Sequence, residues 1–120
     1  MDDRRKYNRL SSSVTLKYEI LYSIGFGSNV KEGEGIAHSI NLSEGGLLFI
    51  SKSSIPLKSF LEVELNLPGE KFVIYIKGEV VHSKELEKNK HEIGIQFEYK
   101  FEKDSEILHH YVMKNSESLK

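Results

Sequence analysis

The chain has 120 residues, 29% of them charged and 38% hydrophobic, which is typical of one globular domain with a single core. Its formal net charge at pH 7 is −1, and this near balance argues against a general DNA- or RNA-binding protein, because such proteins present a broad basic surface to the phosphates. No cysteine is present, which excludes disulfides, thiolate nucleophiles and metal sites built on cysteine.

The N-terminal segment contains every arginine of the chain: Arg4, Arg5 and Arg9. An arginine side chain binds phosphate through two parallel hydrogen bonds and stacks on flat rings, which a lysine does not do. We therefore predict that residues 1–12 form a flexible arm that recognises a small anion, such as one that carries an aromatic base. The segment has no apolar run like that of a signal peptide, and no stretch is long enough to cross a membrane. We expect a cytoplasmic protein that does not insert into membranes.

Apolar residues that alternate with polar ones predict half-buried antiparallel strands. Six such strands are expected, over residues 14–22, 35–41, 46–51, 61–67, 72–81 and 91–99. Gly78 lies inside the fifth of these runs and indicates a bend or a β-bulge there.

Turn-forming residues separate the predicted strands. Four glycines predict a loop over residues 25–35, and a charged hairpin loop is expected over residues 85–90. The dipeptide Pro68-Gly69 is a strong turn signal.

After residue 99 the apolar spacing becomes helical, with Ile107, Leu108, Tyr111 and Val112 on one face. Asp104 or Ser105 is expected as the N-cap of this helix, and residues 115–120 as a polar tail. Six short strands and one helix predict a mainly β fold: a closed six-stranded antiparallel barrel with a short C-terminal α-helix, since closure removes exposed strand edges. We assign residues 13–114 to this barrel and its helix.

Two short motifs carry the candidate chemistry. The first is Arg5-x-x-x-Arg9, just before the first strand, and the second is Asn41-x-Ser43-x-x-Gly46, between two predicted strands. The second motif offers an amide and a hydroxyl, and Gly45 and Gly46 let the backbone bend and let a ligand approach closely. Taken alone, the first motif would be an ordinary solvated tail and the second an ordinary polar loop.

Together and in this order, the two motifs resemble those of the PilZ family. The resemblance covers nearly the whole chain, including residues 93–97, which look like the closing strand of that family, and the helix that follows. It implies a six-stranded β-barrel that binds the bacterial second messenger cyclic di-GMP on its outside, between a flexible N-terminal segment and the second motif.

The resemblance also implies a role for each motif residue. Arg5 and Arg9 would contact phosphate and a guanine edge, Asn41 the other edge of a guanine, and Ser43 phosphate or base, while Gly46 would hold the turn. These roles suit a dianion with two guanine bases, because arginine recognises both phosphate and the O6/N7 edge of guanine. Many PilZ proteins have aspartate where this chain has Asn41, so we expect a weaker contact that lacks charge assistance.

Arg4 bears on the number of ligands. In PilZ proteins an arginine just before the first motif arginine accompanies a stacked pair of cyclic di-GMP molecules, and an apolar residue there accompanies one molecule. Two stacked dianions need additional cations, so the resemblance implies two ligands per domain.

These observations favour a receptor that is not an enzyme and needs no cofactor or metal. The arm would close on the dinucleotide against the turn and so change the surface shown to an unidentified downstream protein, with no nucleic-acid polymer as partner. His109 and His110 are adjacent and point about 100° apart on a helix, unlike a metal-binding pair. Two alternatives are a protein-interaction module of the same fold that binds no nucleotide, and a small nucleic-acid-binding barrel, which the near-neutral charge disfavours.

Overall fold

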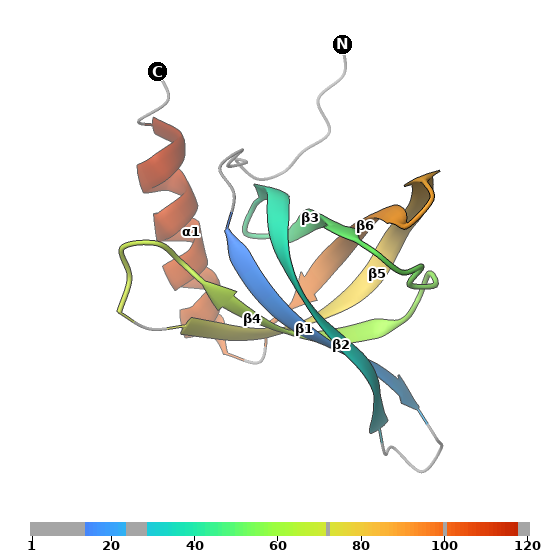
Figure 1. The fold of residues 1–120 in the computed structure, drawn as a ribbon. Helices are drawn as coiled ribbons and strands as arrows, with labels where there is room; N and C mark the ends of the chain where they lie inside the picture. Colours follow the sequence, from blue (N-terminus) through green and yellow to red (C-terminus); the bar gives the residue numbers. More distant parts are fainter. Residues whose placement is uncertain (1–13, 24–28, 72, 100, 118–120) are drawn as a thin grey trace.

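The computed structural model describes residues 14–23, 29–71, 73–99 and 101–117 (Figure 1). Six strands and one helix lie in these ranges: β1 Thr15–Ser23, β2 Asn29–Leu42, β3 Gly46–Ser51, β4 Phe60–Asn66, β5 Val73–Glu87, β6 Lys90–Glu98 and α1 Glu102–Glu117. The predicted arm over residues 1–12, with its three arginines, lies outside the described residues.

The six strands form one closed antiparallel barrel with the order β1-β2-β3-β6-β5-β4, in which β4 pairs back onto β1. Each strand thus has two neighbours, and closure removes most of the exposed edge of this small β domain. Two ends project beyond the closed part: residues 29–38 of β2 pair with β1 on one side, and residues 82–87 of β5 pair with β6 on one side. The predicted fold class, a six-stranded antiparallel barrel followed by one helix, is confirmed.

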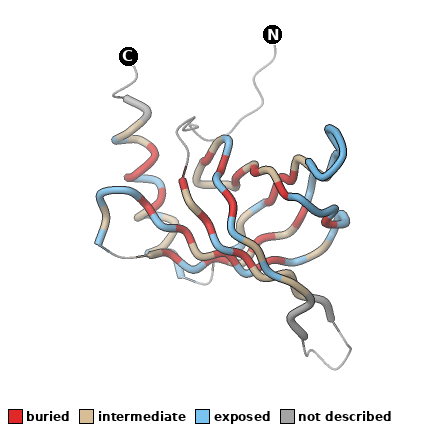
Figure 2. Tube along the Cα trace, viewed as in Figure 1, coloured by how far each residue is buried: buried red, intermediate tan, exposed pale blue. Residues whose placement is uncertain are grey.

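The core fills the barrel because side chains alternate between its two faces (Figure 2). The inward-facing residues are almost wholly apolar, and the largest of those fully buried are Phe49, Leu16, Leu42, Ile55, Leu61, Leu65, Leu67, Ile93 and Leu108. Burying one such side chain stabilises the fold by about 1.5–3 kcal/mol. The helix lies beside the barrel (Figure 1) and adds Leu108, Tyr111 and Val112 to this core.

Two predicted loops are shorter than expected because the strands continue through them. β2 begins at Asn29, so Gly33 and Gly35 lie inside a strand; a Cβ on Gly35 would lie 2.5 Å from the hydroxyl oxygen of Tyr18. The hairpin between β5 and β6 turns at Lys88 and Asn89, and Asn89 adopts a φ of 62°, which asparagine tolerates better than most residues.

The bulge expected near Gly78 lies elsewhere. The β5–β6 register shifts between Val80 and His82, so Val81 is the extra residue, and its side chain is exposed. Gly78 instead serves packing, because a Cβ there would lie 3.0 Å from the Cδ1 atom of Ile95.

The start of α1 also differs from the prediction. The helix begins at Glu102, so Asp104 and Ser105 lie inside its first turn. The Ser105 hydroxyl donates to the carbonyl oxygen of Glu102 at 2.9 Å, and it therefore does not cap a free backbone N–H group. Glu102 and Asp104 place negative charge at the positive end of the helix dipole. At the other end the helix continues to Glu117, three residues beyond the expected boundary at residue 114.

Candidate ligand-binding site

The second motif forms a tight turn between β2 and β3. The backbone N–H of Ser43 donates to the carbonyl oxygen of Gly46 at 2.9 Å. The Ser43 hydroxyl accepts from the N–H of Gly45 at 3.1 Å and donates to the same Gly46 carbonyl at 3.3 Å. Ser43 thus holds the turn in shape, as serine often does in short loops. The sequence predicted a ligand contact for this hydroxyl and did not predict its structural role.

A β-bulge puts Asn41 on the outer surface of the barrel. Ser39 pairs with Phe49, and Asn41 pairs with Leu48, so Ile40 is an extra residue in β2. Ser39 is buried, and regular alternation would place Asn41 on the same inner face. The bulge shifts the phase by one residue, so Leu42 is buried and Asn41 is half-buried on the outside. No described residue forms a hydrogen bond with the Asn41 amide.

Gly46 is required by close packing. A Cβ at this position would overlap the carbonyl oxygen of Ile95 in β6, which is backbone and cannot move aside. The φ angle of Gly46 is not in the left-handed region, so the requirement is one of space between β3 and β6. The sequence predicted that Gly46 holds the turn, whereas the structure requires glycine there for the packing of β3 against β6.

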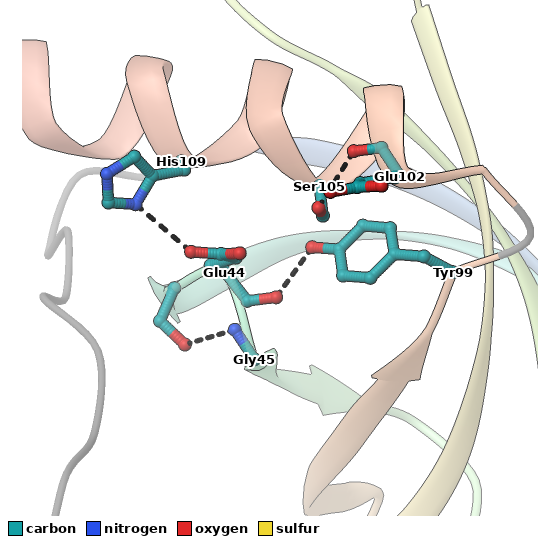
Figure 3. Close-up of polar contacts among 7 residues, drawn as sticks. Glu44, Gly45, Tyr99, Glu102, Ser105 and His109 are labelled. Carbon is teal, nitrogen blue, oxygen red and sulfur yellow. Dashed lines mark hydrogen bonds and ion pairs between the residues drawn. The ribbon is translucent and has the colours of Figure 1, made fainter.

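The two residues between Ser43 and Gly46 are held by the C-terminal part of the chain (Figure 3). The hydroxyl of Tyr99 donates to the carbonyl oxygen of Glu44 at 2.6 Å, and the N–H of Phe97 donates to the carbonyl oxygen of Gly45 at 2.8 Å. Nδ1 of His109, on α1, lies 3.0 Å from Oε1 of Glu44. The turn is therefore fixed from outside as well as by its own bonds.

The described chain begins beside this turn. The N–H of Val14 donates to the buried hydroxyl of Ser39 at 3.0 Å, and the N–H of Ser39 donates to the carbonyl oxygen of Val14 at 2.9 Å. Ser39 is two residues before Asn41. The segment that contains Arg4, Arg5 and Arg9 therefore joins the barrel next to the second motif.

Beside Asn41, three strands follow one another across the barrel. Leu48 pairs with Gly94 of β6, and Gly94 pairs with His82 of β5. Gly94 is buried between these two side chains, since a Cβ there would lie 3.1 Å from the His82 Cβ and 3.3 Å from the Leu48 Cδ1. His82 is held by Glu92, with 2.9 Å between Nε2 and Oε1.

Other kinds of site find little support in the ranges that the structure covers. Among the described residues, no three histidine, aspartate or glutamate side chains lie close enough together to hold a metal ion. None of the described helices is both long and apolar enough to cross a membrane.

The fold and the turn define a small antiparallel β-barrel domain with one terminal helix and a polar loop on its outer surface. The PilZ domain family model matches residues 3–114, and the chain belongs to the PilZ family. No curated protein matches the sequence.

Three solved structures of bacterial proteins share this fold. The inhibitor of motility MotI/DgrA of Bacillus subtilis is 16% identical with a TM-score of 0.69, over 98% of this chain and 53% of that one. The PilZ domain of YcgR from Escherichia coli, solved with c-di-GMP, is 13% identical with a TM-score of 0.63, over 98% and 95%. The MrkH–c-di-GMP complex of K. pneumoniae is 16% identical with a TM-score of 0.69, over 99% and 55%. This chain thus spans about half the length of MotI and MrkH.

The structure brings Asn41, Ser43, Gly45 and Gly46 together at one turn, as the motif predicts. It does not describe Arg4, Arg5 or Arg9. Three residues were not predicted from the sequence: Glu44, which lies in the turn, and Tyr99 and His109, which contact Glu44 from the end of β6 and from α1. The one local signal was Tyr99, a residue at an inward position of the alternating run 91–99 that ends in a polar hydroxyl and so needs a partner when it packs.

Proposed function

We propose that this protein is a receptor for cyclic di-GMP that binds the dinucleotide between the segment of residues 1–12 and the turn at Asn41–Gly46. Membership of the PilZ family supports this proposal. Two proteins of the same fold, the YcgR PilZ domain and MrkH, were solved as complexes with c-di-GMP. Both motifs that carry the resemblance are intact in the chain.

The observation that carries the proposal is the double hydrogen bond between Val14 and Ser39. It fixes the root of the N-terminal segment two residues from Asn41. A chain spans at most about 3.6 Å per residue, so Arg9 lies within about 18 Å of Val14 and Arg5 within about 32 Å. Both arginines can therefore reach a ligand that sits on the outer surface at the turn.

The turn offers the ligand two polar side chains, those of Asn41 and Ser43. The Asn41 amide is half-buried and faces outward, so its oxygen can accept from guanine N–H groups and its nitrogen can donate to an acceptor. The hydroxyl donor of Ser43 makes only a long bond of 3.3 Å within the turn, and it can turn to a phosphate oxygen. Arg5 and Arg9 supply the positive charge that a dianion needs, through charge-assisted contacts to phosphate and to a guanine edge.

Arg4 provides a third cation next to this pair, and we propose that two stacked cyclic di-GMP molecules bind per domain. Four ligand charges in a small volume repel one another unless cations lie among them. In the proposed mechanism the bound ligand joins the arm to the turn and changes the surface presented to a downstream protein. The protein acts as a binding module and not as an enzyme.

Isothermal titration calorimetry with cyclic di-GMP tests the proposal. We expect binding with a ratio near two ligands per chain. Arg5→Ala and Arg9→Ala should each abolish measurable binding, because each removes charge-assisted hydrogen bonds worth about 1.5–3 kcal/mol apiece. Neither change should lower the melting temperature, since the core of the described barrel is built by residues between Val14 and Val112.

Lys88→Ala is the matched control. It removes one positive charge at the hairpin between β5 and β6, at the opposite end of β6 from the turn, and should leave affinity unchanged. Wild-type affinity in the Arg5→Ala or Arg9→Ala variant would contradict the arm mechanism. Absence of binding by the wild-type protein would favour the protein-interaction module instead.

A further inference from the structure

We propose that Glu44 is a positioning residue of the ligand site, through which Tyr99 and helix α1 are coupled to the turn that carries Ser43 and Gly46. Glu44 occupies a position that the motif leaves unspecified, so the motif itself assigns it no role. This inference rests on the proposed function, because it concerns how the same turn is prepared for its ligand.

The backbone of Glu44 is anchored to the end of β6. The Tyr99 hydroxyl donates to its carbonyl oxygen at 2.6 Å, a short bond between residues 55 positions apart in the chain. The Tyr99 ring is itself fixed, since it packs edge-on against the Phe97 ring with 5.8 Å between centroids. The Phe97 N–H binds the next carbonyl, that of Gly45, at 2.8 Å. Two consecutive carbonyl groups of the turn are thus held by two residues near the end of β6.

The side chain of Glu44 is anchored to α1. Its carboxylate lies 3.0 Å from Nδ1 of His109, and Figure 3 shows Glu44 between His109 and Tyr99, below the helix. The carboxylate is mostly covered, with 28% of the side chain exposed, whereas His109 is 52% exposed. A carboxylate beside a site for a dianion would repel the ligand unless a donor holds it. His109 holds it on the helix side of the turn.

These contacts make the turn and the helix one mechanical unit. A turn that is already ordered loses less conformational entropy when a ligand binds, so the ligand binds more tightly. Coupling between two sites is reciprocal, so ligand bound at the turn must stabilise the docked helix to the same degree. We therefore expect cyclic di-GMP to slow the amide hydrogen exchange of α1, although α1 contributes none of the motif residues.

The test combines calorimetry with hydrogen exchange read by mass spectrometry, on the full chain with and without cyclic di-GMP. Tyr99→Phe removes only the hydroxyl and should weaken binding about 3- to 10-fold, the effect of one net hydrogen bond. Glu44→Gln weakens the contact with His109 but also removes a charge that repels the dianion, so for this variant the readout is the ligand-induced protection of α1 and not the affinity. In both variants the ligand should protect the α1 amides less than it does in the wild-type protein.

Two matched controls separate this role from a general loss of stability. Tyr75→Phe removes a hydroxyl from an exposed tyrosine on β5, and Glu106→Gln removes the charge of an exposed glutamate on α1; both should behave like the wild type. If the wild type binds, but Tyr99→Phe keeps its affinity and both variants keep its ligand-induced protection of α1, this inference is wrong and the proposed function stands. If the wild type does not bind, both are wrong.

Discussion

Val14 and Ser39 exchange two hydrogen bonds at the point where the chain enters the barrel. The N–H of Val14 donates to the Ser39 hydroxyl at 3.0 Å, and the N–H of Ser39 donates to the Val14 carbonyl at 2.9 Å. Val14 is 1% exposed and Ser39 4% exposed. A serine is the one polar side chain on this inner stretch of β2, and it satisfies a backbone donor that water cannot reach. The pair ties the segment carrying the arginines to the strand carrying Asn41.

Ser39→Ala should therefore affect both stability and binding. The change leaves the buried Val14 N–H without a partner, which costs about 1–3 kcal/mol of unfolding free energy. It also loosens the root of the arm, so we expect weaker binding of cyclic di-GMP. Urea denaturation and calorimetry measure the two effects. Ser53→Ala, at an exposed serine, should change stability by less than about 0.5 kcal/mol; an equally small effect of Ser39→Ala would contradict the prediction.

Gly46→Ala should destabilise the barrel. The added methyl group would overlap the carbonyl oxygen of Ile95, and separating β3 from β6 costs about 3 kcal/mol or more. Thermal and urea denaturation measure this loss. Gly33→Ala is the control, because a Cβ on Gly33 meets the Ile20 side chain at an ordinary 3.6 Å, and its effect should stay within about 1 kcal/mol. Similar stabilities of the two variants would show that the close approach of Gly46 to Ile95 does not exclude a side chain at this position.

Asn41→Asp should strengthen the binding of cyclic di-GMP. A carboxylate accepts from guanine N–H groups with charge assistance, and such bonds are roughly twice as strong as neutral ones. We expect the dissociation constant to fall about 3- to 10-fold in calorimetry, for a gain near one net hydrogen bond. Asn89→Asp adds the same charge at the distant β5–β6 hairpin and should weaken binding slightly or not at all. A loss of affinity in Asn41→Asp would mean that Asn41 does not face a guanine donor.

Tyr111 makes stability depend on alkaline pH. Burial raises the pKa of its hydroxyl, and the nearby carboxylate of Glu70 raises this pKa further. The folded state therefore holds the proton more tightly than the unfolded state does. This contribution is complete below the ordinary tyrosine pKa of about 10 and is lost as pH rises through the higher folded pKa.

Urea denaturation between pH 8 and pH 11, a range of about three units around the tyrosine pKa, measures this effect. The free energy of unfolding of the wild type should fall at the alkaline end. Tyr111→Phe should make this fall in unfolding free energy less steep. Glu70→Gln should make the fall smaller, because it removes one of the two causes that raise the folded pKa of Tyr111. Tyr75→Phe, at a tyrosine that is 66% exposed, should leave the fall unchanged. A wild-type slope in Tyr111→Phe would assign the alkaline loss to other groups.

Much of the fold could be predicted from local patterns. Side chains on a strand alternate with a period of two, so runs such as residues 61–67 identify a strand and its buried face without knowledge of its neighbours. The turn at Pro68-Gly69 was also predictable from local sequence, because glycine readily adopts the positive φ that such a turn needs. Gly69 has a φ of 86°, and the N–H of Glu70 donates to the carbonyl oxygen of Leu67 at 3.0 Å. The start of α1 could not be predicted, because Asp104 and Ser105 are as suitable in the first turn of a helix as at its N-cap.

The residues of the candidate site could also be identified from the sequence, as two arginines four positions apart and an Asn-x-Ser-x-x-Gly turn. The direction in which the side chains of that turn point could not be predicted. Alternation from Ser39 would bury Asn41, and only the bulge at Ile40, set by the pairing of β2 with β3, turns it outward. Glu44, Tyr99 and His109 meet because the barrel closes and α1 docks beside it. Local sterics and hydrophobic periodicity act over a few residues, whereas strand register and barrel closure depend on strands that are distant in sequence. The sequence alone therefore identifies the binding groups, and the tertiary structure decides where they lie relative to one another.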